Sequence, residues 1–252
     1  MRRQPPHALP GLRPQLASAF AVLFGSVVWA WPIASTLGEQ PSMPPARPAS
    51  ADPHGTAHYL HPAGGVVPPA IVLVGEIAED MYDLSKARDW PKADRKLVAM
   101  EDAARRLPGD VGPNQRKQLD ASVAATAEAV RARQRLAAMR EANEVTRIVA
   151  QITTPFEPRV PVEVALLDYY GRTLEIGATA SDMILLRTTA REIRETWAKV
   201  RPLVRARAKL DEVGRFDRLL GDIEAAASPR AYAVLAAREL DEVDKLERVF
   251  VR

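Results

Sequence analysis

The sequence predicts an all-α protein: an antiparallel up-down-up-down bundle of four long, kinked helices, preceded by a hydrophobic N-terminal helix and a disordered proline-rich tether. Apolar residues recur at spacings of three and four from Ala70 onward, and no stretch alternates as a strand would. Of the 21 prolines, 13 precede Ala70. These two observations divide the chain into residues 1–37, a tether at 38–69 and a helical domain at 70–252.

The N-terminal segment is predicted to be an export signal. Arg2, Arg3 and Arg13 precede an uncharged run, LASAFAVLFGSVVWAW at residues 16–31, which Pro32 ends. With 16 residues, the run is intermediate between the core of a signal peptide and a membrane-spanning helix. Residues 1–37 are therefore expected to be either a cleaved signal peptide or an uncleaved signal anchor, and the protein is expected in the periplasm or another extracytoplasmic compartment.

Residues 38–69 are rich in proline, alanine, serine and glycine and show no hydrophobic period, which is typical of a disordered linker. Fully extended at about 3.1 Å per residue, this tether would reach on the order of 100 Å. The chain has no cysteine. The exported domain must therefore fold without disulfides, on an apolar core that residues 70–252 are long enough to supply.

The first two helical arms are expected at residues 70–107 and 114–152. Asp89-Trp90-Pro91 interrupts the first, because proline lacks a backbone donor and disfavours helical geometry at the preceding residue. The helix is expected to kink or restart there, with Asp89 capping the restarted segment. No interruption is predicted within the second arm, which ends before Pro155.

The third arm is expected from Val164 to Val204, with Pro202 kinking it or marking its last turns. The fourth runs from Lys209 to Phe250 and breaks at Ser228-Pro229. Four arms of similar length joined by short turns pack most simply as one antiparallel bundle. A weak internal similarity between the first and third arms, at an offset of about 93 residues, is explained either by duplication of a helical hairpin or by chance matches between helical stripes.

The composition of the helical domain excludes several classes of function. All four histidines precede Pro62, so the domain contains neither histidine nor cysteine. It cannot build a histidine-activated nucleophile, a common zinc site or a histidine-ligated haem. From Ala70 onward, 31 basic residues alternate with 30 acidic ones, which is typical of solvated helix surfaces and not of a nucleic-acid interface.

One stretch of the third arm resembles a ligand site in its chemistry. Asp168 and Arg172 form an i,i+4 pair, Arg172 and Glu175 an i,i+3 pair, and Tyr169 and Tyr170 stand beside a glycine. Arg172 could hold an anion while a tyrosine supplies a hydroxyl and a stacking face. The alternative is structural: the glycine admits a neighbouring helix, a tyrosine packs inward and the charges pair at the surface.

Trp90 and Trp197 each lie near a proline, Pro91 and Pro202, that is expected to bend a helix. A kink separates helices and leaves apolar surface, so both tryptophans are candidate walls of a ligand cleft. The alternative is ordinary core packing, with the indole N–H donated to a nearby acceptor.

Metal binding is the competing hypothesis. His54, His58 and His61 lie within eight residues of the tether and could chelate copper, nickel or zinc. Carboxylates near the apolar stripes could also bind a hard cation if they face inward, although the Glu-x-x-His pattern of ferritin-like bundles is absent. These acids are Glu76, Asp80, Glu141, Glu144, Asp168 and Glu175.

The sequence therefore predicts an exported, membrane-tethered helical binding protein of a bacterial-type cell envelope, which binds a protein partner or a small ligand. It is not expected to be an enzyme, because no paired acid and base stand out, and no cofactor is implied. Membrane contact would be through the uncleaved N-terminal helix, and no nucleic-acid partner is expected. The alternative is a periplasmic metal-handling protein that uses the tether histidines or inward carboxylates.

Overall fold

The computed structural model describes residues 66–109 and 111–251. These residues form eight α-helices and one short 3-10 helix, and no strand occurs among them. The α-helices are α1 (Pro69–Ala87), α2 (Trp90–Arg105), α3 (Pro113–Arg131), α4 (Arg135–Thr153), α5 (Val162–Ala180), α6 (Met183–Ala206), α7 (Leu210–Ala225) and α8 (Pro229–Val251). The all-α prediction is thus confirmed for the part of the chain that the structure describes.

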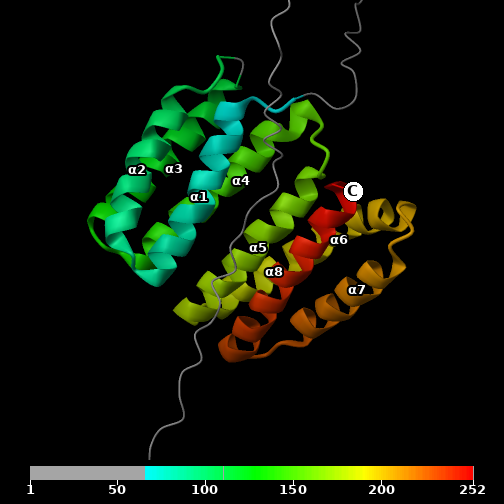
Figure 1. The fold of residues 1–252 in the computed structure, drawn as a ribbon. Coiled ribbons are helices and arrows are strands. Elements are labelled where there is room, and N and C mark those ends of the chain that lie inside the picture. The colour runs from blue at the N-terminus through cyan, green and yellow to red at the C-terminus, as the bar shows by residue number, and fades with distance from the viewer. Residues whose placement is uncertain (1–65, 110, 252) are drawn as a thin grey trace, which may run out of the picture. The chain divides into compact units, whose positions relative to one another are not determined.

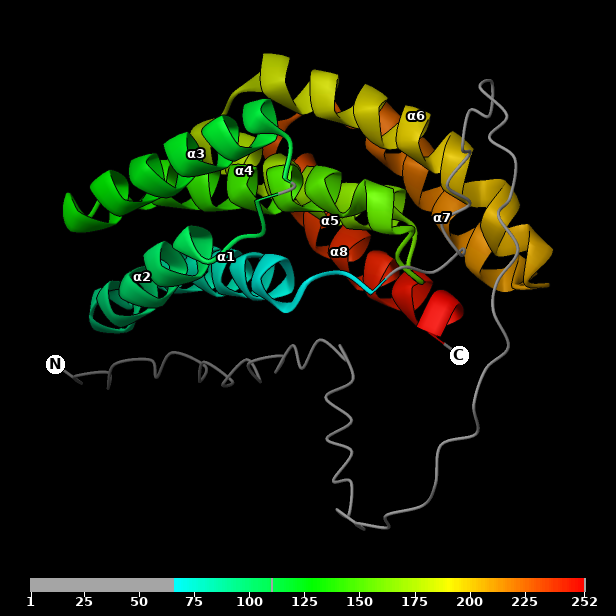
Figure 2. The same ribbon diagram turned by 90° about the horizontal axis from the view of Figure 1, so that it is seen from above.

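The helices form two sets of four, which we call the first half (α1–α4) and the second half (α5–α8). In the first half α1 packs on α2 and α4, and α3 packs on the same two helices. In the second half α5 and α7 each pack on α6 and α8. Each half buries an apolar cluster, that of the first half also taking in Ile176 of α5, and α4 and α5 pack together where the halves join. Figure 1 and Figure 2 show the first half in cyan and green and α6 to α8 in yellow to red.

The prediction of one bundle of four long, kinked helices is not confirmed. Each expected arm is instead a hairpin of two separate helices that pack against each other. The first arm restarts at Asp89: Arg88 ends α1 in the left-handed conformation with φ of 58°, and α2 then packs back against α1. The Asp89 side chain accepts a hydrogen bond from the Lys92 N–H, as expected of a cap, and Pro91 lies in the first turn of α2. Proline is tolerated in the first turn, because the backbone N–H that it lacks would have no helical partner at that position.

Two further breaks fall where the sequence has no proline. Arg133, with φ of 56°, separates α3 from α4, and Ser181, with φ of 57°, ends α5. The expected turn at 155–161 and the break before Pro229 coincide with connections in the structure. Pro202 lies inside α6, four residues before its end at Ala206.

The two halves repeat one plan. Helices α1 and α5 are each 19 residues long and begin at Pro69 and Val162, while α2 and α6 begin at Trp90 and Met183. Both pairs are separated by 93 residues, the offset of the internal similarity. Helices α3 and α7 begin 97 residues apart and α4 and α8 begin 94 apart. Matching helix starts at nearly constant offset favour duplication of a four-helix unit over chance.

None of the described helices is long and apolar enough to cross a membrane. The predicted export segment at residues 1–37 lies outside the described residues, as does the tether up to residue 65. Residues 66–68 are not helical and lead directly into α1.

Candidate functional site

The predicted polar group on α5 lies at the junction between the halves. The Arg172 side chain is only 8% exposed. Its Nε lies 3.1 Å from Asp168 Oδ2, which is one turn away on the same helix, and its Nη2 lies 3.6 Å from Glu79 Oε2 on α1. Arg172 therefore forms the predicted i,i+4 pair and also contacts the carboxyl group of Glu79 in the first half.

Glu175 pairs across the same junction and not with Arg172. The Tyr82 hydroxyl donates to Glu175 Oε2 at 2.8 Å, and Lys86 Nζ lies 2.6 Å from Glu175 Oε1. Glu79 and Arg172, like Tyr82 and Glu175, are 93 residues apart. Equivalent positions of the repeat thus meet each other between α1 and α5, where they carry complementary side chains.

Helix α8 adds a buried acid to this junction. Glu239 is fully buried, and neither carboxylate oxygen has a hydrogen-bond partner among the residues that the structure describes. It fits because residue 171 is glycine: a Cβ there would lie 1.9 Å from Glu239 Oε2. Burial, reinforced by the charge of Asp168, raises the pKa of Glu239 well above its usual value. Burial without a hydrogen-bond donor thus favours the protonated, neutral form of Glu239.

Further carboxyl groups near Arg172 have raised pKa values, and burial is the largest cause in each case. The pKa is about 8 for Glu79 on α1, about 7 for Glu247 on α8 and about 6 for Asp244 on α8. Burial opposes the charge of Arg172, but Asp168 and Glu79 outweigh it and raise the arginine pKa, so Arg172 stays charged. This cluster is equipped to hold or release protons near neutral pH.

The two tyrosines of the predicted site form hydrogen bonds with different helices. The Tyr169 hydroxyl donates to Glu144 on α4 at 3.5 Å, and the Tyr170 hydroxyl donates to Glu192 on α6 at 3.4 Å. Their rings make an edge contact with centroids 5.1 Å apart. The structure therefore places Tyr169 at the junction and Tyr170 against the second half, with neither hydroxyl bonded to Arg172.

The two tryptophans lie in different halves. Trp197 is 2% exposed, stacks on Phe216 with ring centroids 4.3 Å apart, and donates its indole N–H to Asp217 at 2.7 Å. Trp90 packs against the edge of the other apolar cluster, and the Arg133 guanidinium lies 5.7 Å from its ring centre. The structure does not bring the two tryptophans together in one cleft.

For metal binding, the described residues offer no group of three or more His, Cys, Asp or Glu side chains placed to hold an ion. The candidate ligands His54, His58 and His61 lie outside the described residues.

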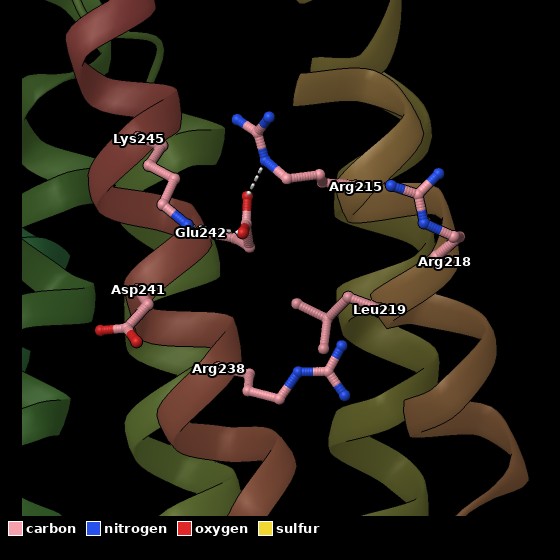
Figure 3. A pocket seen from close by; sticks show the side chains of 7 residues that line it. All are labelled: Arg215, Arg218, Leu219, Arg238, Asp241, Glu242 and Lys245. Carbon is pink, nitrogen blue, oxygen red and sulfur yellow. Dashed lines mark hydrogen bonds and ion pairs between the residues drawn. The ribbon is translucent and has the colours of Figure 1, made fainter. Parts of the chain in front are cut away.

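A basic pocket between α7 and α8 was not predicted from the sequence. Its volume is about 350 Å³. Figure 3 shows four cationic side chains and two carboxylates around it. Helix α7 contributes Arg215, Arg218 and Leu219, and α8 contributes Arg238, Asp241, Glu242 and Lys245.

The pocket carboxylates do not neutralise all the cations. Glu242 accepts from Arg215 Nε at 3.1 Å and from Lys245 Nζ at 2.7 Å. Burial acts to raise the pKa of Glu242, but these two hydrogen bonds outweigh it and hold the pKa below its usual value. Arg238 pairs with Asp222 at 3.0 Å, while Arg218 makes no ion pair with any described residue. Arg215 also pairs with Glu212 at 3.6 Å, so Arg218 is the one pocket cation that no described residue pairs and that is directly available to an anion.

The sequence carried only a faint indication of this pocket. Arg215 and Arg218 are three residues apart, and Arg238 and Lys245 are seven apart, so each pair shares a helix face. Basic pairs at such spacings also occur on α2, α4 and α6, so they do not single out this pocket. Only the packing of α7 against α8 identifies these two faces as neighbours.

A second, shallower groove runs along α1 and α2, with a volume of about 780 Å³. Leu73, Ile77 and Leu84 give it an apolar floor, and Asp80 and Lys96 pair at its rim. Nothing seated on this groove indicates what would cover it, so the basic pocket is the better-defined candidate site.

Comparison of the chain with protein-family models, with curated proteins and with solved structures finds no match in any of the three.

Proposed function

We propose that this chain is an exported, membrane-tethered binding protein of a bacterial-type cell envelope, and that its second half binds a small multivalent oxyanion in the basic pocket. The N-terminal basic residues, the apolar run at 16–31 and the proline-rich stretch at 38–69 support export and tethering. The convergence of four cationic side chains on one pocket carries the assignment of the ligand class.

The chemistry of the pocket favours an oxyanion. Three of its four cations are arginines, whose planar guanidinium groups match phosphate and carboxylate oxygens in pairs. Arg218, which has no ion-pair partner among the described residues, is the group most available to a ligand. A volume of about 350 Å³ is at the lower end of the range for small-molecule pockets, so a small anion fits better than an extended one.

The two carboxylates of the pocket set the charge that the ligand needs. Asp241 and Glu242 would repel any anion, and Glu242 already accepts from two of the cations. A monovalent ion gains little against this competition, whereas an anion with two or more charges can draw Arg218 and Arg238 toward it as well. Pyrophosphate is a suitable probe of this chemistry.

Calorimetric titration of the full chain in detergent with pyrophosphate tests the pocket. Arg218→Gln and Arg238→Gln should together weaken binding about tenfold or more, since each removes a charge-assisted contact. Arg191→Gln is the matched control, because Arg191 is an exposed arginine on α6 away from the pocket. Equal binding by all these variants, or none by the wild type, would contradict the proposed site.

The tethering is tested separately. In membrane fractions, the chain should sediment with the inner membrane, and protease added to spheroplasts should remove the helical part. Intact-mass measurement of the N-terminus would then distinguish an uncleaved anchor from a cleaved signal peptide. A full-length chain that stays in the cytosolic fraction would refute export without affecting the calorimetry.

A second candidate function rests on His54, His58 and His61, three imidazoles within eight residues. In that case the tether captures a metal such as Cu(II). Replacing all three histidines by alanine should then abolish Cu(II) uptake in calorimetry, while Arg218→Gln leaves it unchanged. Undiminished uptake by the triple variant would exclude this function.

A further inference from the structure

We infer that the junction between the two halves is a proton-dependent contact, closed while the carboxyl groups around Arg172 share protons and loosened when those groups all ionise. The geometry of three helices supports this inference. Helices α1, α5 and α8 bring seven carboxyl groups to the junction, where three cations lie among them. The acids are Glu79, Asp83, Asp168, Glu175, Glu239, Asp244 and Glu247, and the cations are Lys86, Arg172 and Arg248.

Glu239 is the clearest proton-binding group of the junction. It is 0% exposed, no donor from residues 66–109 or 111–251 reaches either of its oxygens, and it lies against the backbone of Gly171. An ionised carboxylate in this position would be both desolvated and unpaired, which proteins avoid by keeping the proton. Ionisation of Glu239 should therefore loosen the packing of α8 on α5, the helix that carries Arg172 at the junction.

Glu79 couples this proton binding to the contact between the halves. It is the α1 partner of Arg172, and the charges of Asp168, Glu247 and Asp83 all act on it. While Glu79 and Glu247 hold protons, the single guanidinium has few negative charges to balance. When both lose their protons, α1 and α8 present like charges to each other and to Asp168.

The sign of the pH dependence follows from the raised pKa values. These carboxyl groups bind protons more tightly in the folded chain than in the unfolded one, so they stabilise the contact fully below their unfolded values near 4. That contribution is lost as pH rises through about 6 for Asp244, about 7 for Glu247 and about 8 for Glu79. The junction should thus be tight at pH 6 and loose at pH 9.

This response goes beyond ligand binding at the basic pocket. The change in the contact follows from the buried cluster alone, whereas its use as a response to the environment rests on the proposed location outside the cytoplasm. An envelope protein is exposed to external pH, so a contact that titrates between 6 and 8 would report it.

Hydrogen exchange with mass spectrometry on the full chain in detergent tests the inference, at pH 6 and pH 9 and corrected for intrinsic exchange rates. Peptides from α1, α5 and α8 should lose protection by about tenfold or more at pH 9, while α6 and α7 change less. Protection of the junction that does not depend on pH would overturn the inference.

Two variants attribute the effect to the cluster. Glu247→Gln and Glu239→Gln each remove an ionisable group while keeping its shape, so each should reduce the loss of protection at pH 9. Glu195→Gln is the control, because Glu195 is an exposed acid on α6. If Glu239→Gln does not fold, Glu247→Gln, at a half-buried position, decides the matter alone. Full pH dependence in the Glu247→Gln chain would contradict the inference.

Discussion

The first and second halves share a helical plan but fill their cores differently. The apolar cluster of the first half contains eight alanines and one aromatic side chain, Tyr82. That of the second half contains two alanines and four aromatic side chains, Trp197, Phe216, Tyr232 and Phe250. Hydrophobic period and the order of the helices have thus been retained while side-chain volume has not, which explains why the two halves resemble each other only weakly in sequence.

Single positions show what this divergence produced. The counterpart of Trp197 is Ala104, at the offset of 93 residues. The counterpart of Glu239, at the offset of 94, is Val145, which is fully buried. An acid thus occupies a core position in the second half that an aliphatic residue occupies in the first. The buried acid on α8 is therefore a property of the second half and not of the repeated plan.

The largest expected effect is the loss of the Trp197 side chain. Trp197→Ala should lower the free energy of unfolding by about 3–5 kcal/mol, because it leaves a cavity beside Phe216 and removes the indole hydrogen bond to Asp217. Trp90→Ala, at the edge of the other core, should lower the free energy of unfolding by clearly less. Urea unfolding of the two variants measures both values, and an equal loss would show that the two cores respond alike.

The glycines of the helices provide the next test. Gly171→Ala should destabilise the chain by about 1–3 kcal/mol, because the new Cβ would lie 1.9 Å from Glu239 Oε2 and 2.8 Å from Leu240 Cδ2. Gly221→Ala on α7 meets nothing within 4 Å and should stabilise by up to about 1 kcal/mol. Thermal unfolding would contradict the close packing of α5 on α8 if both variants were stabilised.

The helix caps should give smaller effects, of similar size in the two halves. Asp89 accepts from one backbone N–H of α2, and Asp182 accepts from two of α6. Replacing either by alanine should cost about 1 kcal/mol, with Asp182→Ala the larger. The same denaturant titrations compare the two variants. If one of the substitutions left the free energy of unfolding unchanged, the two hairpins would not be equivalent.

The smallest expected effect concerns the left-handed residues that end α1 and α5. Arg88 and Ser181 have nearly the same conformation, with φ and ψ of 58° and 30° and of 57° and 32°. Arg88→Gly and Ser181→Gly should each stabilise by about 0.5–1 kcal/mol, because glycine adopts this conformation without a steric penalty. If one glycine variant were stabilised and the other destabilised, the two turns would not be equivalent.

Much of the fold could be predicted, because apolar period and proline punctuation are local properties. The start of α2 at Trp90 and the break before Pro229 follow from residues that lack a donor or cap a helix. The breaks at Arg133 and Ser181 could not be found in this way, since each uses a non-glycine residue in the left-handed region. Without those two breaks, the sequence predicts four long helices in place of two sets of four.

The site was predictable only where its residues share a helix. Asp168 and Arg172 pair at the spacing that predicted them, but Glu79 and Glu239 come from helices α1 and α8, far away in the sequence. The basic pocket depends likewise on the packing of α7 against α8. Tertiary neighbours of this kind are not visible in a helical period, which states only that a face is buried and not against what.

Ligand binding should likewise distinguish the halves. At the offsets of 97 and 94 residues, the counterparts of Arg215, Arg218 and Arg238 are Gln118, Ala121 and Glu144. The first half therefore has no equivalent of the basic pocket at these positions.

The most direct test of the central claim is hydrogen exchange of the full chain with and without pyrophosphate at constant pH. Binding at the pocket predicts added protection in peptides of α7 and α8, with none in the corresponding α3 and α4. Protection that is absent from α7 and α8, or equal in the two halves, would contradict a ligand site built only in the second half.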